Sequence, residues 1–362
     1  MHSADARDAR GAQTPLSRSS AAGRVPVIAL TGHLGAGKTS LLNHLLRTPG
    51  ARLGVVVNDF GTLNVDAALV TGQIDEAAAI SGGCLCCLPD AGGLDDALEK
   101  LSQPRLRLDA ILVEASGAAD PLALARLIRF SGAERVRPGG LIEVIDAVEH
   151  FRTVDIWTEP PLHYAAATLV VIGKTDLLSA DERDRTVERI NQRVRERNTD
   201  AQLVVAQQGR IDPALVFDTA LEEELDNQPP LPLPPSSRSD EAHDHHEHEH
   251  ASAATVRLTG PVSPSALVDL IEEPPAGAYR LKGRVRLRGP KAEQGYLVNV
   301  VGRMIHVARL PEPPPVGELV AIGMQLDATA AQQRLEDVAA ATAERPDPAG
   351  LRRLRRHRRL SD

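Results

Sequence analysis

Short, continuous runs of apolar residues, many of them β-branched, recur along the first 225 residues of this 362-residue chain. Turn residues or a helix-like stretch follow each run. Strands that are apolar at every position, rather than at alternate positions, are typical of a parallel sheet covered by helices on both faces. The pattern therefore predicts an α/β domain over residues 25–225, with strands at residues 25–30, 53–57, 110–113, 141–145, 169–172 and 203–205.

The pattern breaks at residue 226. Residues 226–254 are rich in proline and histidine and indicate a flexible linker. Strand-like and helix-like patterns return over residues 255–330 and predict a small α+β domain with four strands and one helix. We expect residues 331–362 to form a helix followed by a solvated, arginine-rich tail, and residues 1–24 to be disordered.

The composition argues against several classes of function. Aromatic residues make up 2% of the chain and the net charge is -8, which argues against a nucleic-acid partner. No run of 18 apolar residues and no signal-like start are present, so we expect no membrane association and a cytoplasmic location. The three cysteines lie within four residues, too close for an unstrained disulfide framework, which indicates reduced thiols.

Residues 32–39 match the Walker A spacing of phosphate-binding loops, with a predicted strand before them and a predicted helix after them. In such a loop the backbone N–H groups surround phosphate oxygens, Lys38 reaches the β- and γ-phosphates and the Thr39 hydroxyl binds magnesium. A lone histidine is weak evidence for a metal site, so His33 is more simply a loop side chain. The predicted phosphate-binding residues are Gly32, His33, Leu34, Gly35, Ala36, Gly37, Lys38, Thr39 and Ser40.

Residues at the ends of two further predicted strands are of the types that nucleotide hydrolases use to bind magnesium and the base. Glu114 ends an apolar run and Gly117 follows it, which suits a carboxylate in the magnesium shell and a glycine near the γ-phosphate. Lys174 and Asp176 follow the apolar run 169–172, where a lysine stem covers a guanine ring and a carboxylate accepts from its N–H groups. Gly173 stands where such loops usually have asparagine, so a plain solvated turn stays an alternative.

A Gly-Gly-Cys-Leu-Cys-Cys stretch lies between these nucleotide elements. Three thiolates on one loop suit a soft or borderline ion, above all Zn²⁺ or Cu(I), with the fourth position open for exchange. Packing as buried apolar side chains is the alternative. The predicted ligands are Cys84, Cys86 and Cys87.

The histidine run in the linker has no fixed geometry and suits weak, rapid metal capture, although a merely solvated polar linker is the alternative. Its members are His243, His245, His246, His248 and His250.

The order and spacing of these motifs, together with Asn-Asp-Phe-Gly at residues 58–61 and Glu-Ala-Ser-Gly-Ala-Ala-Asp-Pro at residues 114–121, resemble the CobW family of GTPases. The resemblance covers residues 25–218 well and extends weakly beyond. It implies that Asp59 and Glu114 border the magnesium and the attacking water, that Asp176 recognises guanine and that the cysteines bind the cargo. Gly173 departs from the family pattern, as do Val57 and Thr62, where some relatives carry metal-binding glutamates.

These expectations combine into a P-loop GTPase that uses GTP and Mg²⁺ to hand zinc to a metal-requiring client protein. Co²⁺ as the cargo, for cobalamin synthesis or nitrile hydratase activation, is an alternative because these ligands accept both ions. Zinc storage without coupled hydrolysis and a small-molecule kinase are alternatives of other classes. A homodimer is compatible with the sequence.

Overall fold

The computed structural model describes residues 24–57, 77–79, 92–117, 120–217, 251–289, 291–341 and 347–361. Asp59, the three cysteines and the five histidines of the linker lie outside the described residues. The phosphate-binding loop, Glu114 and residues 173–176 lie inside them.

The N-terminal part is a parallel seven-stranded sheet with helices on both faces, which confirms the predicted P-loop NTPase architecture. Its strand order is β3-β2-β4-β1-β5-β6-β7. The strands are β1 (Val25–Gly32), β2 (Leu53–Val57), β3 (Ala77–Ala79), β4 (Ala110–Glu114), β5 (Val136–Asp146), β6 (Leu169–Gly173) and β7 (Gln202–Val205).

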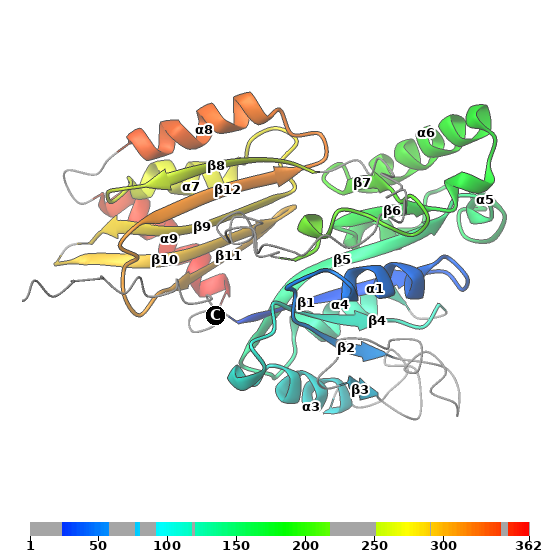
Figure 1. Cartoon of the computed structure of the whole chain (residues 1–362), viewed down its shortest axis with the longest axis horizontal. Coiled ribbons are helices and arrows are strands. Elements are labelled where there is room, and N and C mark those ends of the chain that lie inside the picture. Colours follow the sequence, from blue (N-terminus) through cyan, green and yellow to red (C-terminus); the bar gives the residue numbers. More distant parts are fainter. Residues whose placement is uncertain are drawn as a thin grey trace, which may run out of the picture.

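Two clusters of buried apolar side chains pack against this sheet. Figure 1 shows the strands and the helices that flank them. Helices α3 (Gly92–Leu101), α4 (Pro121–Arg129) and α6 (Ala180–Arg197) contribute to one cluster, and α1 (Lys38–Leu46) contributes to the other. Strands buried on both faces explain why the apolar runs are continuous. The short α5 (His150–Thr153) follows β5 at the edge of the sheet that carries the phosphate-binding loop.

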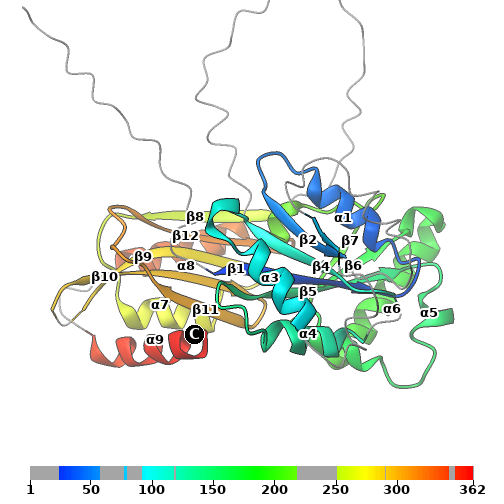
Figure 2. The same ribbon diagram turned by 90° about the horizontal axis from the view of Figure 1, so that it is seen from below.

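The C-terminal part is an antiparallel five-stranded sheet in the order β11-β10-β9-β12-β8. Helices α7 and α9 lie together on one side of it (Figure 2), and α8 packs into the same apolar cluster. The elements are β8 (Ser252–Leu258), α7 (Pro264–Glu272), β9 (Arg280–Arg288), β10 (Glu293–Val301), β11 (Met304–Arg309), β12 (Gly317–Gly323), α8 (Ala328–Ala340) and α9 (Pro348–Ser361).

The arginine-rich end of the chain differs from the sequence-based expectation. Residues 348–361 form α9, and the side chains of Leu351 and Leu354 are buried against the rest of the domain. The expectation of a solvated tail was therefore wrong, because these leucines three residues apart supply an apolar stripe that the arginine count concealed. The small domain includes α8 and α9 rather than ending at residue 330.

The two domains contact each other at the edge of the parallel sheet opposite the phosphate-binding loop. The Tyr279 hydroxyl donates to Thr168 Oγ1 at 3.1 Å, next to the start of β6, and Arg24 Nη1 donates to the Ser361 carbonyl at 2.8 Å. Tyr279 and Val301 join the apolar cluster around α1. Among the described helices, none is long and apolar enough to cross a membrane.

Candidate nucleotide site

The phosphate-binding loop connects β1 to α1. Gly35 and Gly37 adopt positive φ angles of 78° and 102°, which glycine tolerates without strain. A Cβ atom at either position would meet no atom within 4 Å, so the space above the loop is open. The Ala36 N–H donates to the His33 carbonyl at 3.1 Å and closes the turn. The loop is therefore a backbone cradle at a helix N-terminus, the arrangement that binds phosphate.

Lys38 lies inside this cradle. Its Nζ donates to the carbonyl of Gly32 at 2.9 Å and to that of His33 at 3.2 Å, and the residue is 8% exposed. The ammonium group thus points back over the loop that would surround the phosphates. That Lys38 reaches the β- and γ-phosphates stays a prediction.

Thr39 and Glu114 meet beside the loop, although 75 residues separate them in the chain. The Thr39 hydroxyl donates to Glu114 Oε1 at 3.1 Å, and Glu114 is 5% exposed at the end of β4. Because β4 pairs with β1, this carboxylate comes to the first turn of α1. A hydroxyl and a carboxylate are hard oxygen ligands, so the donor set fits Mg²⁺.

Gly117 brings the segment after β4 into contact with the phosphate-binding loop. A Cβ at this position would lie 2.5 Å from the Leu34 nitrogen and 2.6 Å from its Cα, both backbone atoms. Only glycine permits so close an approach. The segment after Glu114 therefore packs against the phosphate-binding loop at Gly117, and the approach of this glycine to a γ-phosphate stays a prediction.

Lys174 and Asp176 lie at the end of β6 on the other side of the loop. Lys174 has a positive φ of 60° and its Nζ donates to Asp146 Oδ2 at 2.6 Å, while Asp176 is exposed. A Cβ at Gly173 would lie 3.7 Å from the Ala36 carbonyl oxygen, an ordinary contact distance. Position 173 thus faces the phosphate-binding loop and has room for a Cβ atom.

The turn after β7, at residues 206–210, also reaches α1. A Cβ on Gly209, whose φ is 76°, would lie 3.2 Å from Ser40 Cβ. Sequence reasoning missed this turn. The run of two glutamines and a glycine directly after an apolar strand was the available signal.

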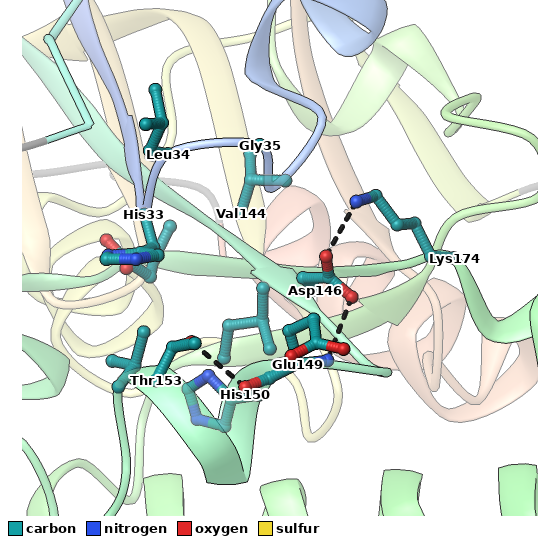
Figure 3. Close-up of a pocket in the computed structure, with 12 residues that line it drawn as sticks. His33, Leu34, Gly35, Val144, Asp146, Glu149, His150, Thr153 and Lys174 are labelled. Atoms are coloured by element: carbon teal, nitrogen blue, oxygen red, sulfur yellow. Dashed lines mark hydrogen bonds and ion pairs between the residues drawn. The ribbon is translucent and has the colours of Figure 1, made fainter.

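A cavity of about 260 Å³ lies between the loop, the end of β5, α5 and Lys174 (Figure 3). His33 and Leu34 face it from the loop, and Asp146 and Glu149 face it from the segment after β5. Burial would raise the pKa of Asp146, but hydrogen bonds from Lys174 and from the backbone of Glu149 and Val148 outweigh burial and lower the pKa. Asp146 is therefore a carboxylate that fixes Lys174.

Glu143 also lines this cavity and was not predicted. Its Oε2 accepts from the Thr31 hydroxyl at 2.5 Å, and burial raises its pKa to about 7 against the effects of that bond and of Lys38. His163 Nε2 lies 3.4 Å from Oε1, but burial lowers the histidine pKa. The two directions favour a neutral pair over an ion pair. A glutamate inside the apolar run 141–145 was the signal in the sequence.

Buried polar groups continue behind α5. His150 Nε2 and the Tyr164 hydroxyl are 2.5 Å apart, and burial lowers the His150 pKa to about 4. Arg193 holds the buried Asp155 with two hydrogen bonds, of 2.9 and 2.5 Å. These bonds tie α5, the 3₁₀ helix at Leu162–Ala166 and α6 together. These hydrogen bonds therefore support the wall of the cavity that α5 forms.

Within the described ranges, no group of three or more His, Cys, Asp or Glu side chains could hold a metal ion. The predicted zinc ligands and Asp59 lie outside those ranges. The structure does place the ends of their segments. Val57 at the end of β2 pairs with Glu114 on one side and with Ala79 at the end of β3 on the other, so the described ends of β2 and β3 lie at the same edge of the sheet as Glu114.

Two family models match this chain. One is described as CobW/HypB/UreG, nucleotide-binding domain, and matches residues 26–205, and the other is the cobalamin synthesis protein CobW C-terminal domain, matching residues 251–339. The chain belongs to the CobW family. The two CobW matches correspond to the parallel-sheet domain and the antiparallel-sheet domain.

Curated relatives of this CobW protein carry related names. The zinc chaperone YjiA of Escherichia coli is 30% identical over 218 residues, which are 57% of this chain and 66% of YjiA. The zinc chaperone CobW of Sinorhizobium is 27% identical, over 56% of this chain and 65% of that protein. Zinc-regulated GTPase metalloprotein activator 1 of Schizosaccharomyces pombe is 32% identical, over 52% and 47%. The chain spans less than two thirds of the length of each.

Among solved structures, the Zn(II)-bound YjiA GTPase from E. coli is similar to this chain, with 23% sequence identity and a TM-score of 0.41. That alignment covers 87% of this chain and 99% of YjiA. HypB from Helicobacter pylori in complex with nickel is 19% identical with a TM-score of 0.38, covering 52% of this chain and 81% of HypB.

Proposed function

We propose that this protein is a GTP-hydrolysing metallochaperone. It binds zinc at Cys84, Cys86 and Cys87 and transfers the ion to client proteins, in the cytoplasm, in a nucleotide-dependent way. The observation that carries the proposal is the meeting of Thr39 and Glu114 at the phosphate-binding loop, at 3.1 Å. Names of the relatives, which are zinc chaperones and a zinc-regulated GTPase, support the cargo and the nucleotide.

Hydrolysis of GTP depends on positioning and charge neutralisation. Lys38 is within the cradle and would turn from the carbonyls of Gly32 and His33 to the β- and γ-phosphates. Thr39 and Glu114 would hold Mg²⁺, which neutralises charge on the phosphates when bound. Asp59, two residues beyond the strand end that pairs with Glu114, would help to orient the attacking water. Without a partner we expect slow turnover.

Guanine would lie between the residues after β6 and the turn after β7. Asp176 is exposed and would accept from the guanine N–H groups, while the Lys174 stem covers the ring. Asp146 keeps the lysine in place through its 2.6 Å bond. This arrangement supports guanine over adenine even though Gly173 replaces the usual asparagine.

Zinc would bind on the segment that begins after β3. Since Ala79 pairs with Val57, and Val57 pairs with Glu114, the cysteine segment and the Asp59 segment start as neighbours at the nucleotide edge. Thiolates suit zinc, and a fourth position left to water or to the client permits exchange. Loss of the γ-phosphate on hydrolysis would change the conformation of both segments and would thereby lower the affinity of the cysteines for zinc. The histidine run of the linker would raise the local metal concentration.

The direct test of the enzymatic part is phosphate release from GTP by the purified full-length protein with Mg²⁺ and no added acceptor. We expect slow, catalytic release from GTP and less from ATP. Omission of Mg²⁺ should abolish the reaction. Absence of GTP turnover, or turnover that requires a small-molecule acceptor, would contradict the proposal and favour storage or a kinase respectively.

A further inference from the structure

Glu143 is buried where β5 passes the start of the phosphate-binding loop. It pairs with Thr31 of β1, and the next pair of residues is Gly32 with Val144. Here the strands are so close that a Cβ atom on Gly32 would lie 2.4 Å from the Val144 carbonyl oxygen. The Gly32 carbonyl accepts from Lys38 Nζ, and Glu143 is 4% exposed. A buried carboxyl group therefore lies one residue pair away from the backbone that holds Lys38.

The Thr31 hydroxyl has one proton and two acceptors within reach. Its oxygen lies 2.5 Å from Glu143 Oε2 and 3.0 Å from the Ile142 carbonyl oxygen. When Glu143 is ionised, the hydroxyl donates to the carboxylate and the carbonyl loses this donor. When Glu143 is protonated, the carboxyl group donates to Thr31 Oγ1 and the hydroxyl donates to the carbonyl. The neutral form thus satisfies more of these buried polar groups than the ionised form does.

Two titratable side chains act on Glu143 from other elements. His163 Nε2, in the 3₁₀ helix, lies 3.4 Å from Oε1, but burial lowers the His163 pKa and keeps this ring neutral near pH 7. Burial raises the pKa of Glu143 to about 7, while the Thr31 hydrogen bond and the positive charge of Lys38 lower it. Lys38 is therefore the cation that compensates an ionised Glu143. The other titratable side chains that line the same cavity are His33, Asp146, Glu149, His150 and Lys174, of which Asp146 and Lys174 bind each other.

The phosphates of a bound nucleotide need the same ammonium group. In the proposed function Lys38 turns from the carbonyls of Gly32 and His33 to the β- and γ-phosphates. An ionised Glu143 attracts Lys38 and repels the phosphates, and both effects oppose binding. A neutral Glu143 does neither. By linkage, bound phosphates favour the protonated form of Glu143, so that binding near neutral pH takes up a proton.

The cavity beside the loop gives this proton a path. Glu143 and His33 both line the space of about 260 Å³ (Figure 3), and a polar cavity of this size holds several water molecules. The carboxyl group can therefore exchange its proton without unfolding of the sheet. We propose that Glu143 is a positioning residue whose protonation controls nucleotide affinity, because the neutral form leaves Lys38 to the phosphates and the ionised form competes with them. This inference rests on the proposed GTP binding and adds its regulation by pH.

The test measures the dissociation constant of GDP with Mg²⁺ for the purified, zinc-free, full-length protein between pH 6 and pH 8.5. Over this range the wild-type affinity should fall by at least about threefold more than that of Glu143→Gln, which cannot ionise. At pH 8.5 Glu143→Gln should bind GDP more tightly than wild type, which loss of a purely structural residue would not cause. The matched control is Glu134→Gln, the same change at an exposed position before β5, which should keep the wild-type profile.

A second variant shifts the titration of Glu143 instead of removing it. The hydrogen bond from Thr31 lowers the pKa of Glu143, so Thr31→Val should raise that pKa. The midpoint of the affinity profile should then move to higher pH. This variant keeps the test decisive if Glu143→Gln fails to fold.

The outcomes separate this proposal from the proposed function. Parallel profiles of wild type and Glu143→Gln, or an unshifted midpoint in Thr31→Val, would overturn the role of Glu143 while GDP binding stands. Absence of GDP binding by wild type at every pH would contradict the proposed function and this proposal with it. Because cysteine thiols also titrate in this range, the comparison is between wild type and variants that keep all three cysteines.

Discussion

At the scale of single residues, a few side chains determine whether the candidate site can bind phosphate and magnesium. Lys38, Thr39 and Glu114 come from distant parts of the chain and meet because β1 and β4 are neighbours in the sheet. Glu143 of β5 accepts from Thr31 of β1, and burial raises its pKa to about 7. Two of these residues allow specific predictions, Lys38 through its positive charge and Glu143 through its raised pKa.

Lys38→Ala should lower GTP turnover by roughly 10²-fold or more, because it removes the one ammonium group inside the described part of the cradle. Phosphate release under saturating GTP measures the change. Lys100→Ala, at an exposed position of α3, should leave the rate unaltered. Similar losses in both variants would refute the role of Lys38.

Glu143 should make the free energy of unfolding depend on pH. Its folded pKa of about 7 exceeds the ordinary 4.5, so the folded state binds the extra proton. The stabilisation from this proton is fully present below about pH 4.5 and is lost as the pH rises through about 7. Glu143→Gln mimics the protonated form and should therefore be more stable than wild type at pH 8 by about 1–3 kcal/mol.

Urea denaturation of the nucleotide-free protein at pH 5.5 and pH 8 checks this. The advantage of Glu143→Gln should shrink at pH 5.5. An equal stability difference at both pH values would show that the group does not titrate between them.

At the scale of secondary-structure elements, part of the fold could be predicted from the sequence and part could not. Six of the seven described strands of the parallel sheet could be predicted because continuous apolar runs have few alternatives. The short β3, which consists of three alanines, gave no such signal. The loop at residues 32–39 could be predicted from its motif, whose glycines Gly35 and Gly37 take positive φ angles. The register that places Gly117 against Leu34 could not be predicted, since it depends on strand order. Glu143, inside the apolar run 141–145, and Asp146, directly after it, were missed because the role of such a polar residue becomes clear only once its neighbours in the fold are known.

The loop after β6 tests whether guanine recognition is weakened. Gly173→Asn should raise the preference for GTP over ATP by about five- to tenfold, since one added hydrogen bond is worth about 1 kcal/mol and position 173 has room next to Ala36. Competition binding of GDP and ADP measures the preference. Gly173→Ala is the control and should leave it unchanged. An unchanged preference in the asparagine variant would mean that this loop does not contact the base.

Helix α9 belongs to the folded domain although its composition suggests otherwise. Leu354→Ala should lower the free energy of unfolding by about 2–4 kcal/mol because the side chain is fully buried. Leu360→Ala, on a residue 76% exposed, should change it by less than about 0.5 kcal/mol. Denaturant titration compares them, and equal effects would mean that α9 is detached in solution.

At the scale of the whole molecule, the proposed nucleotide and zinc sites lie at one edge of the parallel sheet and the domain interface lies at the other. The nucleotide edge of the parallel sheet carries the phosphate-binding loop and the starts of the Asp59 and cysteine segments, while the C-terminal domain packs on the opposite edge. In the proposed function, nucleotide state acts on the zinc ligands at one edge of the parallel sheet, while the C-terminal domain contacts the other edge. This coupling is the central claim of the proposed function.

The most direct measurement is a zinc titration of the reduced protein with Mg²⁺ and either GDP or a slowly hydrolysed GTP analogue. Wild type should show a thiol-dependent site whose affinity differs at least tenfold between the two nucleotides. Cys86→Ser should lose that site, and Lys38→Ala should keep the site but lose the difference. The same zinc affinity with both nucleotides in the wild-type protein would contradict coupling and leave metal storage as the better account.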